Sequence, residues 1–254
     1  MKRMRKAGEF CWINMLTPQP DAARDFFGKL LGWTYFEMPG LGHGIKVGGE
    51  DIGGLFDLNG PQTPPGLPPH IGVMVKVDSV DATCEKVKAL GGSVKMAFDI
   101  MGNLRMGSCV DPTGGHFDLW EPKQKHGTEV DSHLHGAPCW FETLTSDADR
   151  ATKFYTELFG WQADVKSMPG YQYTVLNQGD MQVAGLMQIS PEMGSFPSHW
   201  GVYFTVNDTD ATAELAAKLG GNICLAPRDI PNVGRFAGIK SPQGVLFYVL
   251  KMIC

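Results

Sequence analysis

Residues 69–78 of this 254-residue chain read Pro-His-Ile-Gly-Val-Met-Val-Lys-Val-Asp. A stretch of the same kind returns at residues 198–207, as Ser-His-Trp-Gly-Val-Tyr-Phe-Thr-Val-Asn. Each places a histidine, His70 or His199, at the start of an apolar strand that runs into a helix-capping turn and then a helix. The two stretches therefore predict equivalent strand-helix units, and their histidines are the first candidates for a binding site.

The similarity extends along the whole chain, which indicates a repeated domain. Residues 11–33 return as residues 139–161 at a shift of 128, and the shift is 129 between His70 and His199. It reaches 130 between Pro112 and Pro242. A drift of two residues fits two copies of one domain with small loop insertions. We expect a first domain at residues 1–122, a linker at residues 123–133 and a second domain at residues 134–254.

Each half divides again into two similar units. A unit begins with a short strand, continues with a helix that stops at glycine, and ends with three short strands punctuated by glycine. The helix at residues 21–31 is typical, with Gly32 as its predicted C-cap. Its predicted apolar face consists of Ala22, Phe26, Phe27, Leu30 and Leu31. The pattern predicts an α+β protein in which a βαβββ module occurs four times.

The composition excludes several classes of function. A net charge of −5 and an isoelectric point near 5.8 would not attract a phosphate backbone, so we expect no nucleic-acid partner. No apolar stretch approaches the length of a membrane span, and we expect neither a membrane partner nor a signal peptide. The six cysteines are scattered without a paired spacing, which is typical of reduced thiols in a cytoplasmic protein.

Three segments of the first half carry a resemblance to a known superfamily. They are residues 70–73, residues 84–92 and the stretch at residues 111–119 that begins Asp-Pro-Thr-Gly. The chain resembles the vicinal-oxygen-chelate proteins, which include glyoxalase I, bleomycin- and fosfomycin-resistance proteins and extradiol dioxygenases. Its tandem form is similar to two-domain glyoxalase-like proteins. The resemblance implies four βαβββ modules arranged as two incompletely closed, eight-stranded cups, each with a ligand inside.

The resemblance also implies where a metal would bind. In metal-using members the ligands come from the first and last strands of the modules, and in the first half these positions include His70 and Asp118, 48 residues apart. The ligand position on the first strand is Trp12, which cannot bind a metal. In the second half His199 is kept, and Glu142 is a substitute donor. The implied cofactor is one divalent metal, Fe, Mn, Ni or Zn.

The inward-facing positions that the resemblance implies are rich in aromatic residues, which suits a flat or apolar small molecule. The alternative interpretation is ordinary core packing. Arg105 and Arg235 either line the mouths of the cups or pair with acidic residues. The candidate ligand-binding residues are Trp12, Asn14, Met74, Trp120, Trp140, Glu142, Tyr203, Tyr248, Arg105 and Arg235.

Two functions follow from these residues. The favoured one is a glyoxalase- or bleomycin-resistance-like binding protein that holds a small, partly aromatic or apolar molecule without a full catalytic metal site. The alternative is a metal-dependent lyase, isomerase or dioxygenase that uses His70 and Asp118. Because two tandem domains supply all four modules in one chain, we expect a monomer or a weak homodimer.

Overall fold

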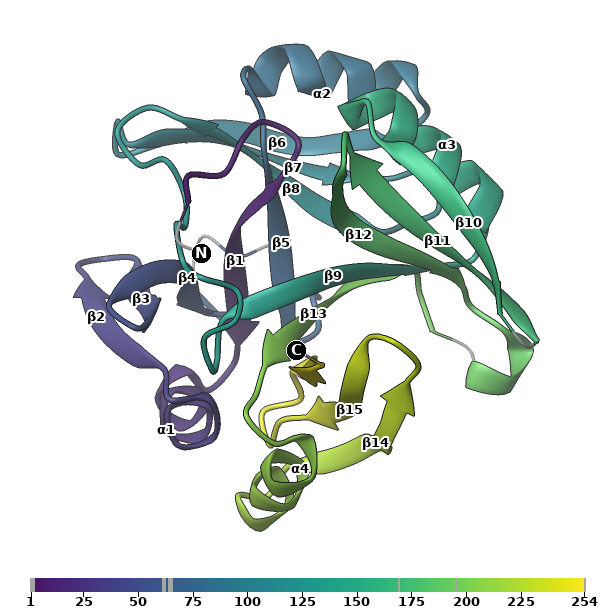
Figure 1. Cartoon of the computed structure of the whole chain (residues 1–254). Coiled ribbons are helices and arrows are strands. Elements are labelled where there is room, and N and C mark those ends of the chain that lie inside the picture. Colours follow the sequence, from purple (N-terminus) through teal and green to yellow (C-terminus); the bar gives the residue numbers. More distant parts are fainter. Residues whose placement is uncertain (1–2, 61–62, 64–65, 169, 195, 254) are drawn as a thin grey trace.

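A computed structural model describes residues 3–60, 63, 66–168, 170–194 and 196–253. Each half contains two βαβββ modules in series, as the sequence predicts (Figure 1). The elements of the first half are β1 (Phe10–Thr17), α1 (Pro20–Leu31), β2 (Thr34–Met38), β3 (Gly42–Val47), β4 (Glu50–Asp57), β5 (His70–Lys76), α2 (Val80–Ala89), β6 (Ser93–Ile100), β7 (Leu104–Val110) and β8 (His116–Pro122).

The second half repeats this order with one additional short 3-10 helix. Its elements are β9 (Pro138–Thr145), α3 (Ala148–Phe159), β10 (Gln162–Met168), β11 (Tyr171–Gln178), β12 (Met181–Gln188), η1 (Pro191–Met193), β13 (His199–Thr205), α4 (Thr209–Lys218), β14 (Asn222–Ile230), β15 (Gly234–Lys240) and β16 (Leu246–Met252).

Each half forms one mixed sheet of eight strands that does not close. The order is β2-β3-β4-β1-β5-β8-β7-β6 in the first sheet and β10-β11-β12-β9-β13-β16-β15-β14 in the second. The first strands of the two modules meet antiparallel at the centre of each sheet, β1 against β5 and β9 against β13. The predicted pair of eight-stranded, incompletely closed cups is confirmed.

The helices begin and end where local chemistry satisfies their free backbone groups. The Ser79 hydroxyl accepts a hydrogen bond from the Ala82 backbone N–H at the start of α2, and the Asp147 carboxylate caps α3 in the same way. Helix α1 ends at Gly32, which has φ 67°, a conformation that costs glycine little. The predicted C-cap is therefore confirmed. The predicted apolar face was wrong at one position, because Ala22 is exposed and Ala23 is buried in its place.

One hydrophobic core runs through both halves, on the faces of the sheets that carry the helices. Helices α1 and α4 lie side by side, as do α2 and α3, so each contact joins a helix of one half to a helix of the other (Figure 1). Phe27 of α1 stacks on Trp33 at 5.0 Å and lies 5.0 Å from Phe247 of β16. The two sheets are therefore held together by packing that neither half completes alone.

Two tryptophans at equivalent positions also tie the halves together. Trp33 Nε1 donates to the Gly136 carbonyl at 2.8 Å, and Trp161 Nε1 donates to the Gly8 carbonyl at 2.9 Å. Both indoles are buried, so these bonds satisfy donors that burial would otherwise leave unpaired. The tryptophans after the first helix of each half are therefore core residues.

The opposite faces of the sheets form the inner walls of the cups and carry separate, smaller apolar clusters. The alternation of side chains along the central strands produces this division: Ile71, Val73 and Val75 join the shared core, whereas Met74 faces the first cup. The cysteines of the described chain, Cys11, Cys84, Cys109, Cys139 and Cys224, are free thiols, and Cys254 lies outside it. Among the described helices, none is long and apolar enough to span a membrane.

Candidate functional site

The tryptophans expected to line the first cup are packed against one another. Trp12 and Trp120 lie 5.2 Å apart and are only 6% and 2% exposed, with Met74 beside them in the same cluster. Trp120 Nε1 donates to the Lys125 carbonyl at 3.1 Å. These rings close one end of the cup, which leaves the more accessible part of the inner wall to the polar residues beyond them.

Those polar residues converge on Gly72 of β5. A Cβ atom built on Gly72 would lie 3.9 Å from His70 Nε2, 3.8 Å from Asp118 Oδ2 and 3.7 Å from the Asn14 carbonyl. Asn14 is the β1 partner of Gly72, and the Asp118 partner on β5 is Met74. The sheet register thus brings the side chains of His70 and Asp118 and the backbone oxygen of Asn14 together around one glycine, where an added methyl group would make only ordinary contacts.

The hydrogen bond of His70 fixes which of its ring nitrogens is an acceptor. Nδ1 lies 2.8 Å from the Pro68 carbonyl, and a carbonyl can only accept, so Nδ1 carries the proton. Burial lowers the pKa of His70, and the bond to Pro68 opposes this only in part. The imidazole is therefore neutral at pH 7, and Nε2 presents a lone pair towards Gly72.

The carboxyl group of Asp118 has a raised pKa. Burial raises the pKa of Asp118 to about 7, and a hydrogen bond with Ser108, its partner on β7, offsets this only in part. The carboxyl group therefore changes charge near neutral pH. It supplies the site with a hydrogen-bonding group and no strong fixed negative charge.

This raised pKa predicts a pH-dependent stability. Between about pH 4 and pH 7 the unfolded chain releases the Asp118 proton while the folded chain keeps it, so the free energy of unfolding falls as the pH rises through this window. Asp118→Asn removes this dependence. The test is to measure the free energy of unfolding in urea at the two pH values. Between them we expect that of the wild type to fall by about 1 to 3 kcal/mol relative to that of the variant. Parallel pH profiles would contradict the assignment.

The side-chain amide of Asn14 has no protein partner for its oxygen. Asn14 Oδ1 is buried, and no hydrogen-bond donor reaches it within the described part of the chain. A buried acceptor left unpaired costs free energy, about 1 to 3 kcal/mol. The structural reason is that β4 offers only Gly54 here, with Asn14 Oδ1 3.1 Å from where a Gly54 Cβ would lie. The first cup therefore contains an unsatisfied acceptor on β1, the strand that pairs with β5 at Gly72.

The second cup satisfies its equivalent positions internally. Glu142 replaces Asn14, and its two carboxylate oxygens accept hydrogen bonds from the hydroxyls of Tyr173 at 2.7 Å and Tyr203 at 3.0 Å. The Tyr173 oxygen in turn accepts from Trp140 Nε1 at 3.0 Å. Burial raises the pKa of Glu142, against the two tyrosine hydrogen bonds. Both carboxylate oxygens of Glu142 thus already have a protein donor.

Aromatic packing also fills the space that the second cup would need. Tyr248 occupies the position equivalent to Asp118 and stacks on Tyr203 at 4.5 Å. Its ring covers Gly201, the equivalent of Gly72, so that an added Cβ on Gly201 would lie 2.7 Å from Tyr248 Cε2. The two glycines are equivalent in the repeat, yet one is open and the other is covered.

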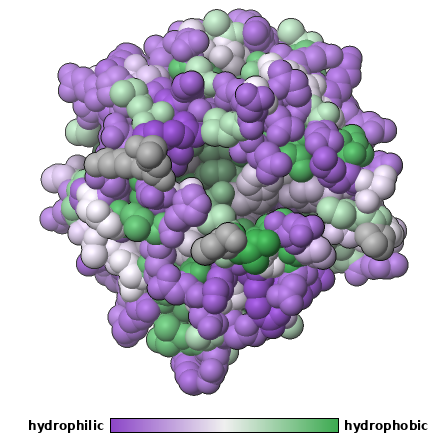
Figure 2. Space-filling model, in the orientation of Figure 1, coloured by the Kyte–Doolittle hydropathy of each residue, from purple (hydrophilic) through white to green (hydrophobic). Residues whose placement is uncertain are grey.

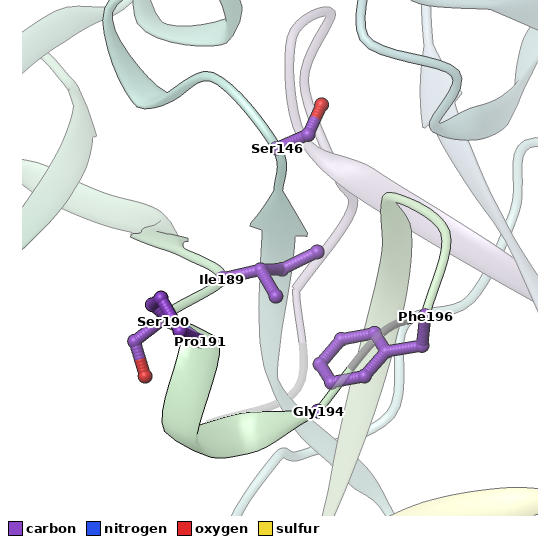
Figure 3. Close-up of a pocket in the computed structure, with 6 residues that line it drawn as sticks. All are labelled: Ser146, Ile189, Ser190, Pro191, Gly194 and Phe196. Atoms are coloured by element: carbon purple, nitrogen blue, oxygen red, sulfur yellow. The ribbon is translucent and has the colours of Figure 1, made fainter.

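His199 lies apart from Glu142's hydrogen-bond network. Its Nδ1 lies 3.0 Å from the Pro197 carbonyl, as His70 does with Pro68, and its ring packs edge-on against Phe196 at 5.4 Å. A surface hollow of about 360 Å³ lies nearby, at the end of β9, and is bordered by Ser146, Ile189 and Phe196 (Figure 3). The hollow is wide open and its described lining carries no charged side chain. Figure 2 shows a mostly hydrophilic face with a central depression whose floor is less hydrophilic.

The repeated arginines pair with acidic residues, the second of the two alternatives that the sequence left open. Arg105 lies 2.8 Å from Asp81 of α2. Arg235 bonds Asp210 of α4 at 2.6 Å and Asp229 at 3.1 Å. Their guanidinium groups are thus engaged on the helix side of the sheets.

The donor set of the first cup does not fit a catalytic metal. Such sites use about three protein ligands, and no group of three His, Cys, Asp or Glu side chains placed to hold a metal occurs in the described residues. Trp12 and Gly54 occupy positions where further donors would be needed. His70 and Asp118 remain as two such donors, with only the neutral amide oxygen of Asn14 as a weaker third, and Asp118 must lose a proton that its surroundings retain up to about pH 7.

Sequence comparison identifies the class. The chain belongs to the Glyoxalase/Bleomycin resistance protein/Dioxygenase superfamily, whose model matches residues 10–119 and again residues 140–249. Two relatives span nearly the whole chain. A Mycobacterium tuberculosis protein named "Putative glyoxylase CFP32" is 39% identical over 247 residues, which is 94% of this chain and 93% of the relative. The anthracycline biosynthesis protein DnrV of Streptomyces peucetius is 30% identical and is matched over 96% and 94% of the two chains.

Solved structures share the fold at low sequence identity. The Mn(II)-bound glyoxalase from Novosphingobium aromaticivorans aligns with a TM-score of 0.68 and 15% identity, covering 97% of this chain and 82% of that one. The 2,2',3-trihydroxybiphenyl 1,2-dioxygenase of Sphingomonas wittichii gives 0.64 and 13%, covering 98% and 92%. A protein that shares this fold has thus been solved with a bound metal.

Three residues at the cups were not singled out from the sequence. Ser108 reaches Asp118 because β7 and β8 pair in register. Tyr173 completes the Glu142 network from β11. Lys125, within the predicted linker, places its ammonium over the Trp12 ring at 4.5 Å. Strand alternation could have indicated Ser108, whereas the other two depend on contacts between distant segments.

Proposed function

We propose that the first cup binds a small, flat, partly aromatic molecule through hydroxyl groups, without a catalytic metal. The observation that supports this most strongly is the buried, unpartnered Asn14 Oδ1, on the residue that pairs with Gly72, around which His70 Nε2 and Asp118 Oδ2 also lie. A ligand that donates hydrogen bonds to these groups would remove the cost of the unsatisfied acceptor. Aromatic side chains such as Phe36 at the same cup suit a flat ligand.

We further propose that the second cup is structural and that one ligand binds per chain. Both oxygens of Glu142 already have protein donors, and Tyr248 covers Gly201. A ligand entering there would have to break these bonds and displace a stacked pair of tyrosines. The relatives named for glyoxylase activity and anthracycline biosynthesis are consistent with a small-molecule ligand for this family.

Calorimetric titration with 2-naphthol tests this proposal, with 2-methoxynaphthalene as the matched probe that has no donor hydroxyl. We expect 2-naphthol to bind with a stoichiometry near one per chain and at least about five-fold more tightly than the methoxy compound, because one hydrogen bond to a buried acceptor is worth about 1 kcal/mol. Equal affinities would show that the acceptors take no part. A stoichiometry of two would overturn the structural role of the second cup.

A further inference from the structure

The ammonium group of Lys125 lies between two aromatic faces of the first cup. Its Nζ is 4.5 Å from the centre of the Trp12 ring and 5.8 Å from the centre of the Phe36 ring. The hydrogen bond from Trp120 Nε1 to the Lys125 carbonyl holds the backbone of this residue against the cup. Lys125 is therefore placed by the same aromatic cluster that closes one end of the cup.

The charge of Lys125 is only partly neutralised. Nζ donates to Asp51 Oδ2 at 2.9 Å, and the other oxygen of Asp51 forms an ion pair with the Lys46 ammonium at 2.6 Å. One carboxylate is thus shared by two ammonium groups. Asp51 is the one hydrogen-bond acceptor of the Lys125 ammonium within the described chain, so two of its three N–H groups remain for water or a ligand. The Lys125 side chain is 31% exposed, which leaves these donors reachable.

The second cup lacks this arrangement. Trp140, the equivalent of Trp12, is held by its bond to Tyr173, and Asn177 occupies the position equivalent to Lys46. The Lys125 ammonium group therefore lies at the first cup, which also contains the unpartnered acceptor Asn14 Oδ1. The first cup offers hydrogen-bond acceptors around Gly72 and a partly free ammonium group near Phe36. A ligand that uses both would carry a different polar group at each end.

We propose that Lys125 makes the first cup selective for aromatic ligands that carry a carboxylate as well as a hydroxyl group, an inference that rests on the proposed function. The hydroxyl donates to the acceptors around Gly72, and the carboxylate accepts from the free N–H groups of Lys125. Lys125 is already paired with Asp51 and offers one compact charge with few remaining donors. It therefore suits a ligand with a single negative charge.

Titration with 6-hydroxy-2-naphthoate and 2-naphthol tests this selectivity. In the wild type we expect the carboxylate to bind about five-fold more tightly, the size of a partly exposed ion pair. Lys125→Met should bring the ratio of the two affinities close to one. Lys123→Met is the matched control, because Lys123 undergoes the same loss of charge but pairs with Asp99 at 2.7 Å, and it should keep the wild-type ratio.

Salt provides a second measurement that needs no variant. Raising NaCl from about 50 mM to about 500 mM should weaken binding of the naphthoate several-fold and leave that of 2-naphthol nearly unchanged. Equal wild-type affinities with no salt effect, or a ratio that survives Lys125→Met, would overturn the role of Lys125 while leaving the proposed function intact. Failure of both probes to bind the wild type would overturn the proposed function and this inference with it.

Discussion

Phe27→Ala is expected to destabilise both halves of the chain together, by about 3 to 5 kcal/mol. Phe27 is fully buried, stacks on Trp33 and contacts Phe247 of the second half. Truncation removes an aromatic side chain from a core that the two halves share and leaves a cavity between them. Because the halves complete each other's core, we expect a single urea transition at lower denaturant concentration, seen alike by tryptophan fluorescence and circular dichroism.

The matched control for this substitution is Phe98→Ala. Phe98 lies on the edge strand β6 and is 38% exposed, so its removal should cost less than about 1 kcal/mol. Two separate transitions for Phe27→Ala, with only one of them shifted, would show that the halves are independent domains with a loose interface.

Gly72→Leu is expected to abolish ligand binding while the protein remains folded. The contacts of a Cβ at Gly72 are all at 3.7 Å or more, which is ordinary van der Waals distance, so the backbone accepts a side chain there. The rest of the leucine would occupy the space between His70 and Asp118. We expect 2-naphthol affinity to fall at least about 30-fold, a loss of about 2 kcal/mol, with the melting temperature nearly unchanged.

The equivalent glycine of the second half should behave in the opposite way. A Cβ at Gly201 would lie 2.7 Å from a buried ring carbon of Tyr248, so Gly201→Ala forces the stacked tyrosines to move. We expect a lowered melting temperature and unchanged 2-naphthol affinity of the folded fraction. Retained binding in Gly72→Leu, or lost binding in Gly201→Ala, would place the ligand outside the first cup.

The fold could be predicted from the sequence because each repeated unit carries local signals, such as helix-ending glycines and alternating apolar residues. Gly32 needs a left-handed conformation at the end of α1, and Gly160 does the same for α3. The alternation of Ile71, Val73 and Val75 with the residues between them divides core from cup. The error at Ala22 is a shift of one residue on a helix face, which alanine's small side chain does not resolve.

The site could be predicted only where strand register determines it. His70, Asp118 and Asn14 were identified as candidates, and the structure brings all three around Gly72. Whether a cup is open or filled depends on rotamers and on long-range contacts. Examples are the bond from Tyr173 to Glu142 and the position of Lys125 over Trp12, neither of which follows from sequence spacing.

We propose that protein acceptors in the first cup, and no bound metal, hold the ligand. The most direct test is the 2-naphthol titration on chain stripped by dialysis against EDTA, repeated after addition of Mn(II). The donor set around His70 and Asp118 predicts the same affinity, within about two-fold, in both preparations. Binding that disappears on stripping, returns with Mn(II) and is absent from His70→Ala in both preparations would contradict the claim.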